Sequence, residues 1–231
     1  MTGVPGFCVA PHGATADRAT IAALGEVPVA ALGDVLGRRG IMDAGIKPLS
    51  DMTRIAGPAL TVETRPGDNL MLHAALKIAR PGDILVVNGH GYAEAAVWGM
   101  LMTHTAIAVQ LGGLIIDGAL RDRQEIVASG FAAYTRWICA AGPHKDGPGQ
   151  VNLPVACGGV AVRSGDVIVG DADGIVVIAA EDAGFALHKG RAKVAAEDRR
   201  AREINEDGVL HQGWLIPTLS KMGLFGTDGA Q

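Results

Sequence analysis

The order of elements that the sequence predicts is that of an α/β protein with three layers. The middle of the chain alternates strands and helices, as βαβ units do. The C-terminal half instead holds several short apolar runs separated by tight turns, and then one long charged helix. The first pattern predicts parallel strands and the second predicts antiparallel hairpins, so we expect a mixed sheet with helices against it.

The chain starts with an irregular segment over residues 1–14, which is rich in glycine and proline. A short helix is predicted over residues 17–24, with Asp17 near its N-terminus. A second helix is predicted over residues 29–37, because basic residues followed by Gly40 suit a helix C-terminus.

Two strands with a helix between them come next. Residues 55–64 are predicted to form a strand, and residues 65–68 a turn. The helix over residues 69–78 has apolar residues at helical spacing, and Asp68 is placed to cap it. Residues 84–88 read as a buried strand, after which Gly89 opens a loop.

The central stretch runs from residue 95 to residue 122. Residues 95–111 are apolar at helical spacing, and the glycines at 112 and 113 stop that helix. Residues 114–116 predict an interior strand, and Asp117-Gly118 predicts a turn. Arg121 and Asp122 follow at the exit of the strand. They are either an exposed ion pair or a site where Arg121 binds an anionic substrate and Asp122 holds a hard divalent metal.

The rest of the chain supplies a small hairpin-rich part and a long helix, and nothing marks an internal linker, so we expect one domain over residues 1–231. The predicted elements are a helix over 123–129, a strand over 131–134, a surface loop over 141–150, apolar strands within 155–162, 167–169 and 175–178, a charged helix over 180–206, and an apolar tail over 214–219.

Composition excludes several classes of protein. Of the 231 residues, 48% are hydrophobic and 19% charged, which is typical of a globular chain rather than a disordered one. The net charge of −4, without a basic stripe, argues against nucleic acid as a partner. No signal peptide or membrane span is expected. The three cysteines show no metal-binding spacing, which favours reduced thiols in a cytoplasmic protein.

The central stretch resembles the family of the regulator of ribonuclease activity A and the 4-hydroxy-4-methyl-2-oxoglutarate aldolases. Its matching features are Gly99, a helix, Gly-Gly, an apolar strand, Asp-Gly and then Arg121-Asp122. Four further motifs lie in register over residues 27–182: Pro66-Gly67-Asp68-Asn69, Arg80-Pro81-Gly82-Asp83, Val151-Asn152-Leu153-Pro154-Val155, and the segment from Gly165 to Gly174. The resemblance implies the swivelling β/β/α fold of phosphohistidine domains, followed by a C-terminal helix, and a homotrimer or a hexamer.

The resemblance also implies an activity, that of a class II pyruvate aldolase. Such a lyase cleaves a 4-hydroxy-2-oxo acid to pyruvate, or decarboxylates oxaloacetate, through a metal-stabilised enolate. Asp122 would hold Mg²⁺ or Mn²⁺, and Arg121 would bind the carboxylate and oxo group of the small 2-oxo acid. The backbone N–H groups of Gly99, Met100, Leu101 and Met102 would hold the other side of the carboxylate, as the start of a helix can.

One position departs from the aldolases and leaves the proton acceptor open. Twenty-one residues before Arg121 they carry an acid, where this chain has Met100. The regulator-type members have glycine there, so a protein that binds and inhibits a ribonuclease or another protein partner is the alternative function. The candidate bases are His73, His90 and His104. Glu125, and either Glu197 or Asp198 of a neighbouring subunit, are candidate neighbours of the metal or the substrate. Lys145 and Asn152 are candidate contacts to a distal carboxylate of the substrate.

Overall fold

The computed structural model describes residues 2–51, 53–208 and 212–224. The chain divides into two compact units, one up to Arg191 and one from Ala192 onward. The expectation of one domain over residues 1–231 stays a prediction.

Four parallel strands form the centre of the first unit. They are β4 (Ile55–Thr64), β5 (Ile84–Trp98), β6 (Gly113–Leu120) and β7 (Ala133–Ile138). Each pairs with the next one along the chain. The βαβ pattern predicted from the sequence is therefore confirmed.

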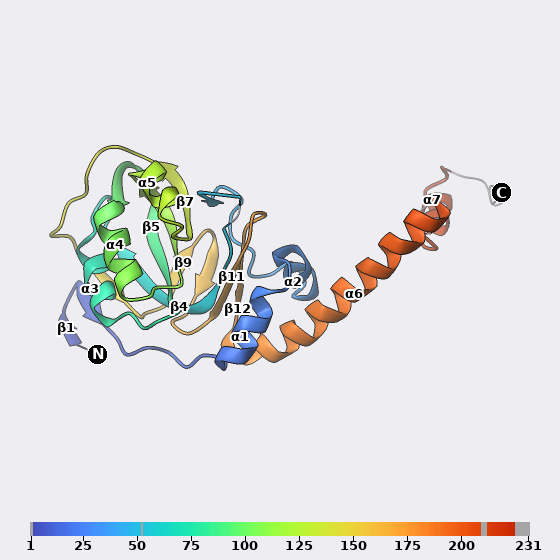
Figure 1. Ribbon diagram of the computed structural model, residues 1–231, viewed down its shortest axis with the longest axis horizontal. Coiled ribbons are helices and arrows are strands. Elements are labelled where there is room, and N and C mark those ends of the chain that lie inside the picture. Colours follow the sequence, from blue (N-terminus) through green and yellow to red (C-terminus); the bar gives the residue numbers. More distant parts are fainter. Residues whose placement is uncertain (1, 52, 209–211, 225–231) are drawn as a thin grey trace. The chain divides into compact units, whose positions relative to one another are not determined.

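The helices that connect these strands cover one face of the sheet (Figure 1). They are α3 (Leu70–Ile78), α4 (Met100–Ala108) and α5 (Arg123–Ala128). Alternate strand residues face them, because side chains alternate across a strand: Leu85 belongs to the core beneath the helices, whereas Val86 belongs to the core on the opposite face.

Short antiparallel strands cover that opposite face. The strands β9 (Val155–Cys157) and β10 (Val160–Val162) pair with each other, and β11 (Val167–Gly170) pairs with both β12 (Ile175–Ile178) and the first half of β4. Strands, sheet and helices make three layers. A mixed α/β fold is thus confirmed, while its assignment to the swivelling class stays a prediction.

Four strands at the margins complete the sheet, in the order β1-β2-β8-β4-β5-β6-β7-β3. Their bounds are β1 (Thr2–Val4), β2 (Phe7–Val9), β3 (Lys47–Pro48) and β8 (Gly149–Val151). The hairpin of β1 and β2 covers residues 2–9, so the prediction of an irregular start is wrong there, whereas residues 10–14 belong to no helix or strand, as predicted. The strand β2 of this hairpin pairs with β8, which in turn pairs with β4. Because β8 lies far from the hairpin along the chain, the local sequence does not reveal this pairing.

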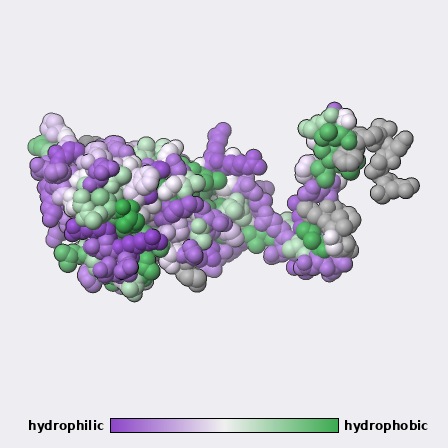
Figure 2. All heavy atoms as spheres, turned by 90° about the horizontal axis from the view of Figure 1, so that it is seen from above, coloured by the Kyte–Doolittle hydropathy of each residue, from purple (hydrophilic) through white to green (hydrophobic). Residues whose placement is uncertain are grey.

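The remaining helices are α1 (Arg18–Gly25), α2 (Val29–Val35), the 3₁₀-helix η1 (Ala180–Asp182), α6 (Ala183–Asp207) and α7 (Leu215–Lys221). Three of them, α1, α2 and α6, lie where the sequence predicts helices, whereas the apolar tail over residues 214–219 was not predicted to be helical. Asp17 caps α1 by accepting a hydrogen bond from the Thr20 N–H, at 2.9 Å. No helix in the described part of the chain is long and apolar enough to cross a membrane. On the face seen in Figure 2, hydrophobic residues are interspersed with hydrophilic ones.

Two boundaries differ from the prediction in the central stretch. Residues 95–98 belong to β5 rather than to the helix that follows, because β5 continues through several bulges to Trp98. Asp117 and Gly118 lie inside β6 rather than in a turn. The Asp117 carboxylate is tolerated there because it accepts hydrogen bonds from Arg136 Nε, at 2.6 Å, and from the Gly158 N–H, at 2.9 Å.

Asp68 joins the loop over residues 141–148 to the start of α3. Its fully buried carboxylate accepts hydrogen bonds from the N–H groups of Leu70, Asp146 and Gly147, at 2.7–2.9 Å, and from Arg65. Burial by itself raises the pKa of Asp68, but these hydrogen bonds and the charge of Arg65 outweigh it and lower the pKa. The loop is therefore held by an ionised carboxylate.

Replacing this carboxylate tests its contribution to stability. Because the pKa is lower in the folded state, the contribution is present above the unfolded pKa of about 4 and is lost as the pH falls. We expect Asp68→Asn to reduce the free energy of unfolding by about 1–3 kcal/mol at pH 7. In urea denaturation, the difference from wild type shrinks below about pH 4. An equal difference at every pH would contradict a charge effect, and Asp173→Asn, at an exposed carboxylate outside this cluster, is the control.

Candidate active site

The ends of two neighbouring strands bring the predicted site residues together. The last residues of β5 and β6, Trp98 and Leu120, pair directly. Gly99 then begins α4, while Arg121 and Asp122 lead into α5. Because carboxyl ends of parallel strands meet at one edge of a sheet, the two segments lie side by side there.

Two hydrogen bonds join these two segments. The Met100 N–H donates to Oδ2 of Asp122 at 2.9 Å, and the Arg121 N–H donates to the carbonyl of Trp98 at 3.0 Å. Asp122 has a φ of 60°, in the left-handed region that aspartate tolerates better than most residues. Its negative charge thus lies at the positive end of the α4 dipole, which stabilises it.

Gly99 leaves the room that this arrangement needs. A Cβ atom at residue 99 would lie 2.6 Å from Oδ2 of Asp122 and 3.2 Å from Nε of Arg121. The backbone of Gly99 is extended, with φ of −160°, so space rather than conformation demands glycine. The Arg121 guanidinium also lies 3.7 Å from Asp122, measured from Nε to Oδ2.

The first turn of α4 has two kinds of N–H group. Those of Met100 and Met102 already donate, to Asp122 and to the carbonyl of Gly99. Those of Gly99 and Leu101 have no acceptor among the residues that the structure describes. The turn is braced from inside, because Trp98 Nε1 donates to Thr103 Oγ1 at 2.8 Å. Two donors are therefore available to a ligand.

A cavity of about 110 Å³ opens over these groups. Arg121 and Asp122 line it on one side, and residues from α3 and from the 141–148 loop line it on the other: Asn69, His73, Pro143 and Lys145. The side chain of Met100 is absent from the lining and packs against the core beneath the helices. Residue 100 thus contributes its main chain to the site.

Asn69 is a site residue that the sequence did not single out. It is 4% exposed, and its Nδ2 lies 3.4 Å from Sδ of Met102. Its Oδ1 is buried and has no hydrogen-bond partner among the described residues. An unpaired buried oxygen is unfavourable, so a ligand that donates a hydrogen bond in the cavity would stabilise it. Its signal in the sequence was its place at the end of the Pro66-Gly67-Asp68-Asn69 motif, which by itself assigned it no role.

The three candidate histidines are placed differently. His73 lines the cavity, and partial burial together with the charge of Lys145 lowers its pKa. His90 lies in the bulged part of β5, with Nε2 3.5 Å from Oε1 of Glu63, and lines another hollow. His104 is exposed on α4 and is absent from the cavity lining. Of the three, His73 alone is positioned to meet a ligand beside Asp122.

The other candidates divide in the same way. Lys145 lines the cavity, whereas Glu125 is exposed on α5 and is absent from the lining. Asn152 is buried and has a structural role, since it donates to the carbonyl of Ala10 and accepts from Ser164. Glu197 lies in the second unit, where it pairs with Lys193 at 2.8 Å.

Asp122 determines which kind of metal the site fits. Among the described residues no group of three or more His, Cys, Asp or Glu side chains lies together in a way that could hold an ion. The Asp122 carboxylate has one oxygen bonded to an amide and the other directed at no partner in the described structure. Mg²⁺ is commonly bound by one or two carboxylates and keeps several waters. The donor set therefore fits a hard divalent cation.

Comparisons with known proteins agree on one family. The model of the family described as RraA-like, Aldolase/RraA, matches residues 19–177. A protein of Halalkalibacterium halodurans, provisionally named 4-hydroxy-4-methyl-2-oxoglutarate aldolase, is 34% identical over 82% of this chain and 90% of its own length.

Several solved structures are similar to this one, among them the following two. A protein from Pseudomonas syringae has a TM-score of 0.73 and 26% identity, covering 85% of this chain and 96% of its own. RraAS2 of Streptomyces coelicolor, described as an unusual member of the RNase ES inhibitor RraA protein family, has a TM-score of 0.72 over 84% of this chain and all of its own, and at 24% identity it supports the fold alone. The resemblance inferred from the central stretch is confirmed, and the chain belongs to the RraA-like, Aldolase/RraA family.

Proposed function

We propose that the protein is a divalent-metal-dependent carbon–carbon lyase. Its substrate would be a 4-hydroxy-2-oxo acid of the 4-hydroxy-4-methyl-2-oxoglutarate type, cleaved to pyruvate, or oxaloacetate, which it would decarboxylate. The observation that carries this proposal is the Asp122 carboxylate, held by the Met100 amide beside Arg121 at the start of α4. A bound Mg²⁺ or Mn²⁺ would supply Lewis-acid polarisation of the 2-oxo group.

The residues of the chain would bind and orient the substrate. Arg121 can grip a carboxylate with two parallel hydrogen bonds, and the free N–H groups of Gly99 and Leu101 offer donors from the other side. Oδ1 of Asn69 would accept a hydrogen bond from the substrate hydroxyl. This last contact favours a hydroxy acid over oxaloacetate, which has no such donor in its keto form.

His73 is our proposed base for the 4-hydroxyl proton. Its lowered pKa keeps the imidazole neutral, and thus able to accept a proton, to a lower pH than an ordinary histidine. This role would replace the acid that the aldolases carry at the position of Met100. The side chain of residue 100 packs into the core here, which argues against an added carboxylate at that position reaching the substrate.

Asp122→Asn tests the metal assignment. Asparagine also tolerates the left-handed backbone of residue 122, so the fold should persist, but an amide lacks the charge that holds a hard cation. We expect Mn²⁺ binding, followed by electron paramagnetic resonance, and oxaloacetate decarboxylation both to fall at least a hundredfold. Glu125→Gln, three residues along, is the matched control. Unchanged Mn²⁺ affinity in the Asp122 variant would overturn the assignment.

Gly99→Ala tests whether the position of the carboxylate matters. The new methyl group would displace Asp122 from the Met100 amide. We expect kcat/KM to fall at least tenfold, about 1.4 kcal/mol, with little change in Tm. Gly184→Ala is the control, because a Cβ there meets nothing within 4 Å. Full activity in the Gly99 variant would show that the amide–carboxylate contact is dispensable.

The acid side of the pH profile tests His73. We expect kcat/KM for the hydroxy acid to fall only below the ordinary histidine pKa of about 6.5. Lys145→Gln removes a charge that lowers the pKa of His73, so this limb should move to higher pH, whereas Lys77→Gln should leave it in place. His73→Gln should abolish the limb and cost about 10²-fold or more in rate. If kcat/KM of His73→Gln still falls at acid pH as in wild type, the base is another residue.

We also propose a homotrimer or hexamer with this site near a subunit boundary. Large apolar side chains remain exposed close to the strand ends that form the site: Leu101 is 82% exposed, Trp137 47% and Ile138 50%. Light scattering at micromolar concentration should give three or six times the chain mass, and a monomer would contradict it. Within the family, inhibition of a ribonuclease or another partner is the alternative function, favoured if folded wild-type protein shows no lyase activity with any divalent metal.

A further inference from the structure

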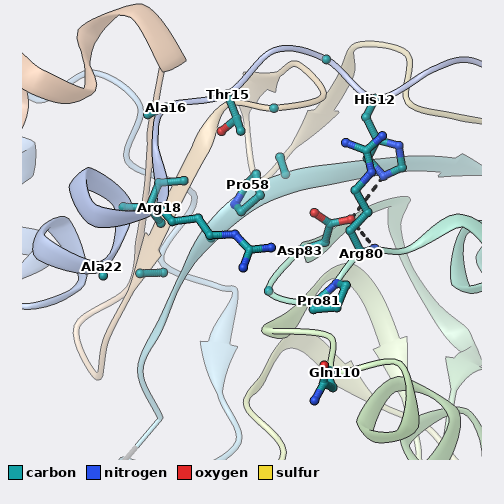
Figure 3. A pocket seen from close by; sticks show the side chains of 17 residues that line it. His12, Thr15, Ala16, Arg18, Ala22, Pro58, Arg80, Pro81, Asp83 and Gln110 are labelled. Atoms are coloured by element: carbon teal, nitrogen blue, oxygen red, sulfur yellow. Dashed lines mark hydrogen bonds and ion pairs between the residues drawn. The ribbon is translucent and has the colours of Figure 1, made fainter.

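A second and larger cavity lies at the opposite end of the central strands. It measures about 490 Å³ and is formed between α1, the first half of β4 and the turns that lead into β5 and β6. Gly82 and Asp83 line it just before β5, and Gln110 lines it shortly before β6 (Figure 3). The candidate active site is at the carboxyl ends of the same strands, so the two cavities are separate.

Two arginine side chains reach into this cavity without an ionic partner. Arg18, the first residue of α1, extends across it toward Asp83, and Arg80 extends toward His12 (Figure 3). Neither guanidinium group forms an ion pair or hydrogen bond with any residue that the structure describes. The lining thus carries two guanidinium charges against the single carboxylate of Asp83, a balance that favours an anion.

The one acid in the lining has another task. Oδ2 of Asp83 accepts a hydrogen bond from the Arg80 N–H at 2.8 Å and lies 3.3 Å from Nε2 of His12. The Asp83 side chain is 5% exposed. Its carboxylate thus fixes the turn and orients the imidazole, and it leaves both guanidinium groups available.

The remaining wall is mostly apolar. Ile21 and Ala22 contribute from α1, Ala56 and Pro58 from β4, and Pro81 from the turn. A concave site of this size, with an apolar wall and a few polar groups, is typical of sites that bind small molecules. Arginine is suited to the charged end of such a ligand, because its planar fork matches carboxylate and phosphate oxygens.

We propose that this cavity binds a small organic anion. Its carboxylate or phosphate group would lie between Arg18 and Arg80, and its apolar part would lie against Ile21, Ala22 and Pro58. The proposal does not rest on the lyase function, because none of these residues lines the cavity beside Asp122.

The test uses 8-anilinonaphthalene-1-sulfonate, an apolar anion whose fluorescence rises when it is bound, titrated into the full-length protein. We expect the double variant Arg18→Gln/Arg80→Gln to weaken binding at least tenfold. Neutral N-phenyl-1-naphthylamine, which lacks the sulfonate, should bind both proteins alike. Arg39→Gln, at an exposed arginine outside the cavity, is the charge control. Equal sulfonate affinity in wild type and the double variant, or no binding to wild type, would overturn the proposal.

A steric variant and two competitors complete the test. Ala22→Phe should fill the cavity and weaken binding of both probes, whereas Ala19→Phe, on the same helix but outside the lining, should not. Displacement of the sulfonate by benzoate identifies a carboxylate site, and displacement by phenyl phosphate identifies a phosphate-ester site. Failure of both anions to displace it, or equal effects of the two phenylalanine variants, would place the probe elsewhere and reject the site.

Discussion

The pairing of β5 with β6 up to their last residues is the constraint on which the candidate site depends. Asn88 pairs with Asp117, and Trp98 pairs with Leu120. Between these two pairs β6 advances by three residues, whereas β5 advances by ten. The extra residues are taken up in bulges, so the two strands still end together. Trp98 anchors that end, since its indole donates to Thr103 and stacks on Phe131 with ring centroids 6.4 Å apart. The start of α4 and the Arg121-Asp122 pair are thereby held in contact.

A second, longer connection assembles the far wall of the cavity. Asn69 and Lys145 are 76 positions apart in the chain, yet both line it. Asp68 links them, because its carboxylate binds both the first turn of α3 and the loop that carries Lys145. The site is thus built from one local contact between strand ends and one buried carboxylate that closes a long loop.

The sequence predicted those parts of the molecule that have local signals. The helix–strand alternation and the Arg121-Asp122 pair were visible because they depend on neighbours in the chain. The turn predicted at Asp117-Gly118 was wrong because the partners that allow a buried carboxylate, Arg136 and Gly158, lie 19 and 41 positions further on. The role of Asn69 was not predicted for the same reason. Its Oδ1 lacks a hydrogen-bond partner only because of how residues distant in the chain pack around it, and the local sequence does not show this.

The hydrogen bond between Met100 and Asp122 has a consequence for which side chains residue 100 can carry. Residue 100 contributes a main-chain N–H, which every amino acid except proline possesses. Its side chain can therefore be exchanged for that of any other residue except proline while the contact to the Asp122 carboxylate is kept. The anchor of Asp122 thus places no demand on the chemistry of the side chain at residue 100.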